Sequence, residues 1–318
     1  MKFLLLTEPN IDYMKQDISR RFLNFISSLR NCSNFKPLLI TIAIIGIGSP
    51  VYGENNRKSL SDTDSLYVSY LLSIVSPQES IGDYCTAFAH LLIGTPYVSG
   101  TLDGDSTERL VANMQELDCT TFAESVLALA RTATQGRHNT TTFCDELQQI
   151  RYRRGIIDGY SSRLHYFSDW IADGEAMGLV HEISREIGGE PKPLHLNYMS
   201  RHADRYPTLQ RDSTLIDSIA VQEARLSNDT IYYIPTAHID RKTIATIHDG
   251  DIIAFTCDIE GLDVAHVGIA TRDKERVYII HASSSQGKVV KEVRHLQQQL
   301  SDTRRFTGIR VIRPTYRQ

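Results

Sequence analysis

Long hydrophobic runs, clustered cysteines, internal repeats and an excess of positive charge are all missing from this sequence of 318 residues. Its five cysteines are scattered, which excludes a small domain held together mainly by disulfides. Lys and Arg total 34 against 38 Asp and Glu, so the composition does not favour a nucleic-acid-binding protein. Charged residues make up 23%, an ordinary globular value that excludes a disordered, collagenous or coiled-coil chain.

An uncharged apolar run over residues 37–48 is too short to span a membrane comfortably. Basic residues precede it, and Val51 and Gly53 are small enough for the −3 and −1 positions of a signal-peptidase site. We therefore predict an export signal region over residues 1–53, a single domain over residues 54–318 and a periplasmic location. The alternative interpretation of the apolar run is a buried core segment.

The charge balance after removal of the signal also limits the partners. The remaining chain carries 28 basic and 35 acidic side chains, a net charge of −7. Such a protein gains nothing from phosphate steering, so we expect no nucleic-acid partner. No cysteine closely follows the apolar run, so we also expect no stable membrane anchor after signal cleavage.

Hydrophobic periodicity predicts an α+β domain. Amphipathic spacing indicates helices over residues 66–75, 80–93, from 118 onward, and 141–153. Residues 155–245 show no clean periodicity. The last quarter instead contains short β-branched runs separated by turn residues, at 252–256, 264–271, 277–281 and 308–312. Helices first and strands last favour an α+β fold with one antiparallel sheet.

Cys119 is the candidate nucleophile. Asp118 is a favourable N-cap residue, which places Cys119 in the first turn of a helix. Unpaired N–H groups and the helix dipole favour a thiolate there, and the same N–H groups can stabilise an oxyanion. The alternative interpretation is a buried structural cysteine.

Two histidines can complete the chemistry that a thiol needs. His266 lies within one expected strand and His281 ends the next. If these strands are adjacent, the two imidazoles can share a face, and His281 can orient His266 as the base. Core packing is the simpler role for a strand histidine. A zinc site that includes Cys119 or Cys257 is a further alternative, although no CxxC or HExxH spacing supports it.

Several short segments, taken in order, resemble the NlpC-type papain-fold cell-wall hydrolases. They are Gly94–Gly100 (GTPYVSG), Asp118–Cys119, Gly250–Phe255 (GDIIAF), His266–Ile269 (HVGI) and His281–Ser283 (HAS). Other segments are similar to one branch, the N-acetylmuramoyl-L-alanine amidase-like family. These are Arg151–Arg153, Ser162–Trp170, Tyr198–Ser200 and Tyr232–Pro235. The resemblance covers roughly residues 85–315.

The resemblance implies a fold and a set of roles. A papain-like fold would pack the helix that bears the nucleophile on an antiparallel sheet that carries both histidines, with extra helical and loop insertions. Cys119 would be the nucleophile, His266 the base and His281 the orienting residue. Tyr97 would lie beside the thiol and help to hold the oxyanion, and Asp118 would be among the substrate-binding residues.

One departure from the common endopeptidase pattern concerns specificity. That pattern is Asp-Cys-Ser-Gly, in which Asp and Ser grip a free peptide amine. Thr120 and Thr121 replace the Ser-Gly pair here, which fits the amidase branch better.

The segment Arg163–Trp170 is the candidate for contact with a sugar. Trp170 is the chain's single tryptophan, and an indole can stack on a pyranose face. Arg163 and His165 can bond hydroxyl groups or a carboxylate, and Tyr166 adds an aromatic ring. The alternative interpretation is that Trp170 and Tyr166 are core residues.

The resemblance finally implies an activity. It is hydrolysis of the amide between N-acetylmuramic acid and L-alanine in peptidoglycan fragments, preferably 1,6-anhydro-muropeptides, without metal or cofactor. An NlpC-type endopeptidase that cuts the D-glutamyl–diamino acid bond is the nearest alternative. An inactive glycan-binding protein and a cytosolic thiol acyltransferase are others; the complete set of catalytic residue types argues against the first, and the signal region against the second.

Overall fold

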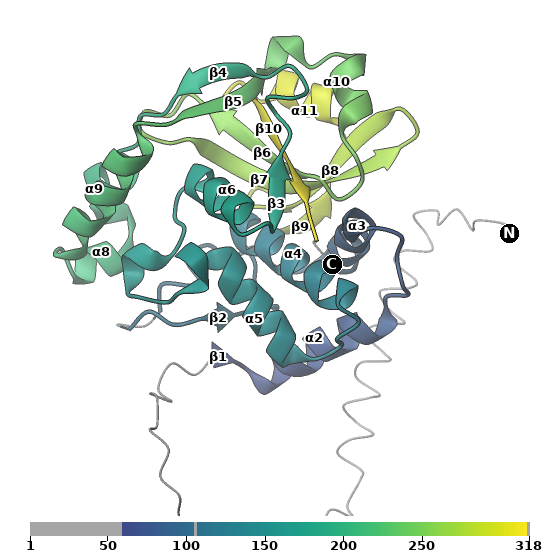
Figure 1. Ribbon diagram of the computed structural model, residues 1–318, viewed down its shortest axis with the longest axis horizontal. Coiled ribbons are helices and arrows are strands. Elements are labelled where there is room, and N and C mark those ends of the chain that lie inside the picture. The colour runs from purple at the N-terminus through teal and green to yellow at the C-terminus, as the bar shows by residue number, and fades with distance from the viewer. Residues whose placement is uncertain (1–58, 105–106, 317–318) are drawn as a thin grey trace, which may run out of the picture. The chain divides into compact units, whose positions relative to one another are not determined.

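Helices gather against one broad antiparallel sheet in this computed structural model (Figure 1). The structure describes residues 59–104 and 107–316, which belong to a unit that runs from Gly53 to Gln318. The predicted export signal, residues 1–53, lies outside the described residues. The prediction of an α+β fold with an antiparallel sheet is confirmed.

The first half of the unit is mainly helical, and the four predicted helices are present with small shifts at their ends. Helix α4 is the most buried of these helices. Every residue from Thr121 to Ala133 is buried, so α4 forms the centre of the helical layer. The elements are β1 (Ser59–Leu60), α2 (Asp62–Ile74), α3 (Ile81–Leu91), β2 (Val111–Ala112), α4 (Cys119–Thr134) and α5 (Thr140–Arg151).

The middle third, where periodicity gave no prediction, consists of many short elements. Most have too few residues to show a helical or strand period. They are η1 (Arg153–Gly155), η2 (Tyr160–Ser162), α6 (Phe167–Ala176), β3 (Val180–Glu182), β4 (Glu190–Pro193), α7 (Tyr198–Arg201), η3 (Ala203–Arg205), α8 (Pro207–Arg211), α9 (Leu215–Leu226), β5 (Thr230–Pro235), η4 (Thr236–His238) and α10 (Arg241–Thr246).

The last quarter supplies the centre of the sheet. Within the described residues the strand order is β4-β5-β10-β6-β7-β8-β9, with β3 pairing β10. The remaining elements are β6 (Ile252–Cys257), β7 (Val264–Asp273), β8 (Arg276–Ser283), β9 (Lys288–Lys291), α11 (Leu296–Asp302) and β10 (Phe306–Pro314). All six residues of β6 are buried, because both faces of this central strand are covered.

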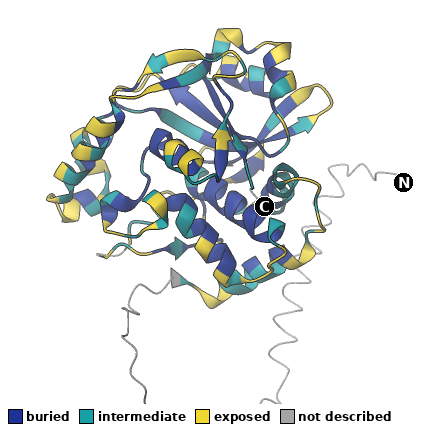
Figure 2. Ribbon diagram, in the orientation of Figure 1, coloured by how far each residue is buried: buried dark blue, intermediate teal, exposed yellow. Residues whose placement is uncertain are grey.

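Two hydrophobic clusters cover the two faces of the sheet. On one face Val267 and Ile280 pack with residues of α3 and α4. On the other face Ile279 packs with Leu296 and Leu300 of α11. Figure 2 shows the result as dark blue along the strands and along α4. Helix α4 is therefore fixed against the sheet over its whole length.

A buried ion pair ties α4 to its neighbours. The guanidinium of Arg151, at the end of α5, lies 2.7 Å from the carboxylate of Glu124 in α4, and both side chains are at most 3% exposed. Arg151 also donates a hydrogen bond to the carbonyl of Val111 in β2. The next residue, Tyr152, donates its hydroxyl hydrogen to Glu108 at 2.7 Å. Arg151 and Tyr152, from one of the segments that resemble the amidase-like family, therefore hold the helical layer together.

Replacing Arg151 with Met should lower the free energy of unfolding by about 3–5 kcal/mol, because the Glu124 carboxylate is left charged and buried without its partner. Thermal or urea unfolding followed by circular dichroism measures the change. Arg154→Met is the matched control, since Arg154 is exposed. The double variant Glu124→Leu/Arg151→Met should recover much of the loss. A single variant as stable as the parent would contradict the prediction.

Candidate active site

Helix α4 begins at Cys119, and a reciprocal capping interaction fixes that start. The Asp118 carboxylate accepts a hydrogen bond from the Thr121 N–H at 2.8 Å, and the Thr121 hydroxyl accepts one from the Asp118 N–H at 2.9 Å. The predicted place of Cys119 in the first turn is confirmed. The Asp118 carboxylate, which was expected among the substrate-binding residues, is engaged in capping the helix.

Backbone hydrogen bonds hold Tyr97 beside this helix start. The Tyr97 N–H donates to the Gly287 carbonyl at 2.9 Å, which fixes the segment to the turn before β9. On the other side, the Leu117 N–H donates to Pro96 at 3.0 Å, and the Val98 N–H donates to Leu117 at 3.2 Å. Since Leu117 lies two residues before Cys119, these bonds fix the separation between the tyrosine segment and the thiol.

The thiol of Cys119 is not poised as a thiolate. Burial, and then the charge of Asp118, raise its pKa to about 11, although the Val267 N–H and the Thr120 hydroxyl favour the thiolate. The groups at the helix start favour the thiolate, as expected, but in the resting protein desolvation outweighs them. Burial, followed by the charges of Cys119 and Asp118, also raises the pKa of Tyr97, which keeps its hydroxyl a hydrogen-bond donor.

His266 and His281 form a hydrogen-bonded pair. Nε2 of His266 lies 2.6 Å from Nδ1 of His281, and the two rings are nearly perpendicular. The rings of Phe255 and Phe306 stack on each other and lie near His266, with centroids 5.8 and 6.4 Å from its ring. Burial, then the proximity of His281 and Arg305, lower the pKa of His266 to about 3, so its imidazole is neutral at rest.

The sheet positions this pair. Strands β7 and β8 are neighbours, which is the condition under which the two imidazoles can share a face, and β7 passes close to β8 at Gly268. A Cβ atom at Gly268 would lie 2.4 Å from the Ile279 side chain and 3.0 Å from Cβ of His281, so glycine is required there. A β-bulge between Phe255 and Thr256 breaks the alternation of side chains opposite the start of β7.

Cys119 lies beside β7 at Val267, the residue that follows His266. The backbone N–H of Val267 lies close enough to Cys119 to favour its thiolate. Cys119 is only partly buried, whereas the other cysteines in the described residues, Cys85, Cys144 and Cys257, are buried. The structure thus gathers Cys119, His266, His281 and Tyr97 where α4 and its preceding segment meet β7, β8 and β9.

The predicted sugar-contact residues Trp170 and Tyr166 are core residues instead. Trp170 is 2% exposed and stacks on Phe167, with ring centroids 4.7 Å apart. The hydroxyl of Tyr166 donates to Glu223 at 2.7 Å and accepts a hydrogen bond from the Met199 N–H. The expectation that the indole offers a free face to a pyranose is wrong, because packing between α6 and the helical layer covers it.

Arg163 and His165 are also occupied within the protein. Arg163 is buried and forms ion pairs with Asp103 at 3.0 Å and Glu108 at 3.2 Å. Nε2 of His165 is hydrogen-bonded to the Tyr160 carbonyl at 2.9 Å. Burial and then the Arg163 charge lower the pKa of His165 to about 3. These two side chains hold the loop before α6 rather than offering free groups to a ligand.

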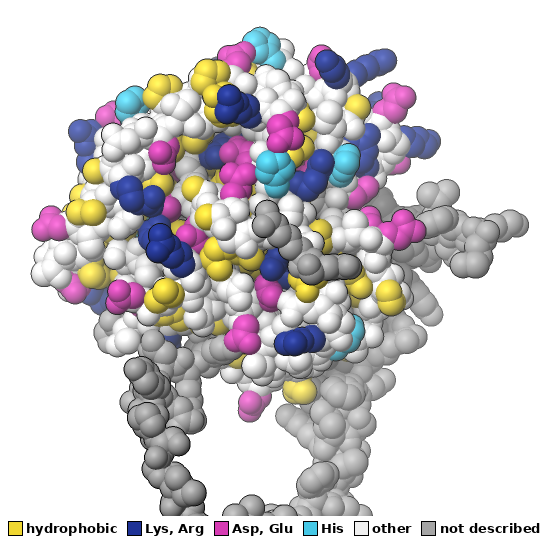
Figure 3. All heavy atoms as spheres, viewed as in Figure 1, with side chains coloured by type: hydrophobic (Ala, Val, Ile, Leu, Met, Phe, Trp, Pro, Cys, Tyr) yellow, Lys and Arg dark blue, Asp and Glu magenta, His cyan; other side chains and the backbone are white. Residues whose placement is uncertain are grey.

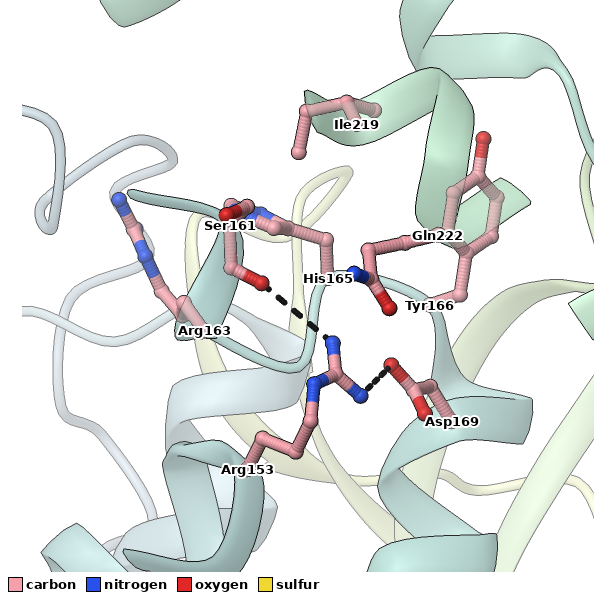
Figure 4. Close-up of a pocket in the computed structure, with 8 residues that line it drawn as sticks. All are labelled: Arg153, Ser161, Arg163, His165, Tyr166, Asp169, Ile219 and Gln222. Carbon is pink, nitrogen blue, oxygen red and sulfur yellow. Dashed lines mark hydrogen bonds and ion pairs between the residues drawn. The ribbon is translucent and has the colours of Figure 1, made fainter. Parts of the chain in front are cut away.

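A small pocket opens beside this loop (Figure 4). In it Arg153 donates to the Asp169 carboxylate at 2.6 Å and to the Ser161 carbonyl at 3.4 Å. The cavity volume is about 10 Å³, enough for about one water molecule and far too little for a sugar ring. Its lining residues are Arg153, Ser161, Arg163, His165, Tyr166, Asp169, Ile219 and Gln222, none of which contributes to the thiol–imidazole group.

Some functional features had no signal in the sequence. The Val267 N–H and the rings of Phe255 and Phe306 are placed by strand register, which a single sequence does not reveal. On the face shown in Figure 3, positive and negative side chains are interspersed. No three His, Cys, Asp or Glu side chains are grouped as metal ligands within residues 59–104 and 107–316. The helices of the same ranges are too short or too polar to cross a membrane.

Comparisons with known proteins identify the family. The model of the N-acetylmuramoyl-L-alanine amidase-like family matches residues 87–307. An N-acetylmuramoyl-L-alanine amidase structure from Bacteroides uniformis is 38% identical, with a TM-score of 0.71, and the match covers 74% of this chain and 99% of that one. A Bacteroides fragilis protein provisionally described as a xylanase is 42% identical over 71% of this chain and 98% of its own, with a TM-score of 0.68.

A Legionella pneumophila structure shares the fold alone, at 20% identity and a TM-score of 0.62, over 80% of this chain and 95% of its own. A search of curated proteins found no match. The family match spans both the helix that begins at Cys119 and the strands that carry the two histidines. This chain belongs to the N-acetylmuramoyl-L-alanine amidase-like family of peptidoglycan hydrolases.

Proposed function

We propose that this protein is an exported cysteine amidase with a papain-like catalytic arrangement. It hydrolyses the amide between the lactyl group of N-acetylmuramic acid and L-alanine in soluble peptidoglycan fragments. Cys119 is the nucleophile, His266 the base and His281 the residue that orients His266. The observation that carries the proposal is the contact of Cys119 with β7 directly beside the hydrogen-bonded histidine pair.

The reaction starts from a neutral thiol and a neutral imidazole. His266 takes the thiol proton as the sulfur attacks the lactyl carbonyl, so the thiolate forms only when substrate is present. Because Nε2 of His266 is engaged by His281, Nδ1 is the nitrogen that receives the proton. The tetrahedral oxyanion is stabilised by N–H groups of the first turn of α4 and by the Tyr97 hydroxyl.

Protons balance over the two half-reactions. The imidazolium of His266 returns its proton to the leaving amine of L-alanine as the C–N bond breaks and the thioester remains. Water then attacks the thioester, His266 takes a proton from that water, and the proton returns to the departing sulfur. The muramic acid product leaves with a new carboxyl group, which ionises in solution, and the thiol is regenerated without any redox step.

The choice of bond rests on the residues around the nucleophile. Thr120 and Thr121 stand where the endopeptidase pattern has Ser-Gly; the Thr120 hydroxyl acts on Cys119, and the Asp118 carboxylate is engaged in the cap with Thr121. A free peptide amine therefore lacks its usual pair of acceptors. We propose that the sugar side of the substrate supplies the binding energy instead, with 1,6-anhydro-muropeptides as preferred substrates.

Cys119→Ala should abolish hydrolysis. It should leave the free energy of unfolding within about 0.5 kcal/mol of the parent, since the thiol contributes little to the core. Cys257→Ala is the control that should keep activity, because Cys257 is buried away from β7's contact with α4. Turnover by the Cys119→Ala protein at the parent rate would exclude the cysteine mechanism.

The fall of kcat/KM on the acid side of the pH profile should lie at unusually low pH. Because burial and then His281 and Arg305 lower the pKa of His266 to about 3, the base stays unprotonated far below the usual 6.5. We expect kcat/KM to remain on a plateau down to about pH 5 and to fall only as His266 gains a proton. An acid limb at pH 6.5 would contradict this.

Folding stability should also fall at acid pH, because histidines that are buried and neutral bind fewer protons than the same residues in the unfolded chain. The pKa values of His90, His165 and His266 are all lowered, mainly by burial. The unfolded chain therefore takes up more protons as the pH falls below about 6.5, and stability decreases in that window. Circular dichroism at each pH separates unfolding from loss of the base.

A substrate pair tests which bond is cut. A disaccharide-tetrapeptide should release a peptide headed by L-alanine, whereas the matching free tetrapeptide should remain intact, because without the sugar the carbonyl is not placed at Cys119. Mass spectrometry identifies the products, and the anhydro-sugar form should react faster than intact sacculus. Cleavage after D-glutamate in the free peptide would instead assign the endopeptidase activity.

A further inference from the structure

The outer ring nitrogen of His281 is an unpaired polar atom in a buried place. Nε2 of His281 has no hydrogen-bond partner among the described residues and negligible exposure. If Nδ1 of His266 is to accept the thiol proton, its Nε2 must carry hydrogen and donate to Nδ1 of His281. His281 then carries its own proton on Nε2, and burying an N–H group without a partner is unfavourable.

A buried carboxylate lies on the same face of the sheet. In the β8–β9 register His281 pairs with Val290, and the Glu292 N–H donates to the Ile279 carbonyl at 2.8 Å. Opposite residues and residues two apart share a face, so His281 and Glu292 are diagonal neighbours. Their Cβ atoms are within about 7–8 Å, a gap that a histidine and a glutamate side chain can close. Glu292 is only 5% exposed.

We propose that Glu292 is a positioning residue for His281, and that its carboxylate accepts a hydrogen bond from the Nε2–H of His281 while His266 acts as the base. This inference rests on the proposed cysteine function. A change in the side-chain torsions of Glu292 brings the two groups into contact. In this arrangement Nε2–H of His281 donates to Glu292, and Nε2–H of His266 donates to Nδ1 of His281.

Arg294 holds and moderates the Glu292 carboxylate. Its guanidinium donates to the two carboxylate oxygens of Glu292 at 2.9 and 3.1 Å, and reaches Asp302 at 3.4 Å. A carboxylate offers about four acceptor positions, so these bonds leave room for His281. Although burial opposes it, Arg294 keeps the pKa of Glu292 below its usual value, so the acceptor is ionised.

The charges around the histidine pair predict opposite effects of two substitutions. Burial is the main cause that lowers the pKa of His281; the Glu292 charge raises it and the Arg294 charge lowers it further. Arg305 is the charged group that acts on His266. Removing Glu292 should therefore shift the protonation of the pair to lower pH, and removing Arg294 should shift it to higher pH.

The test compares Glu292→Gln and Arg294→Gln with the full-length parent on a disaccharide-tetrapeptide. Glu292→Gln should lower kcat about tenfold with little change in KM, and its acid limb should move down by about half a pH unit. Arg294→Gln should move the limb up by a similar amount. Glu275→Gln is the matched control, since Glu275 is exposed at the β7–β8 turn and should change neither. Glu292→Asp should restore part of kcat.

Imidazole ¹⁵N NMR of the same substitutions in a Cys119→Ala background separates this inference from the proposed function. If the cysteine mechanism fails, the histidine resonances still report whether Glu292 is coupled to His281. The expected result is a proton on Nε2 of His281 and titration shifts of opposite sign in the two variants. Equal shifts, or none, in Glu292→Gln and Arg294→Gln would overturn the proposal, even where both proteins fold and turn over.

Discussion

The start of α4 must meet the sheet at one point, and the rest of the site depends on that contact. Because α4 is buried over nearly its whole length, it cannot slide along the sheet without opening the core. The Asp118–Thr121 cap fixes which residue comes first, and the Val267 N–H fixes where that residue touches β7. Cys119 and the strand that carries His266 are thus brought together although they lie far apart in the sequence.

The parts of the site that the sequence predicted are those that depend on local rules. Asp118 before Cys119 follows the preference for an N-cap residue, and the helix begins there. His266 and His281 were expected on two strands of one antiparallel sheet because both lie in β-branched runs, and β7 and β8 do pair. The same reasoning gave the central strands β6 and β10, but not β9, which has only four residues.

The parts that failed depend on tertiary burial. Trp170 has the chemistry of a sugar-stacking residue, but only the packed structure shows that its faces are covered by Phe167 and the helical core. The thiol of Cys119 has a helix start in its favour, yet desolvation decides its protonation. Composition tells which groups exist in a segment, whereas the side of an element that faces the core depends on residues elsewhere in the chain.

The raised pKa of Cys119 also affects how the protein withstands oxidation. Oxidants attack the thiolate, and a thiol with a pKa of about 11 is ionised in only about one molecule in 10⁴ at pH 7. The partly exposed sulfur is therefore slow to reach sulfenic acid, the first step towards irreversible oxidation states. A cysteine that is held as a neutral thiol can therefore withstand oxidants without a second thiol to rescue it.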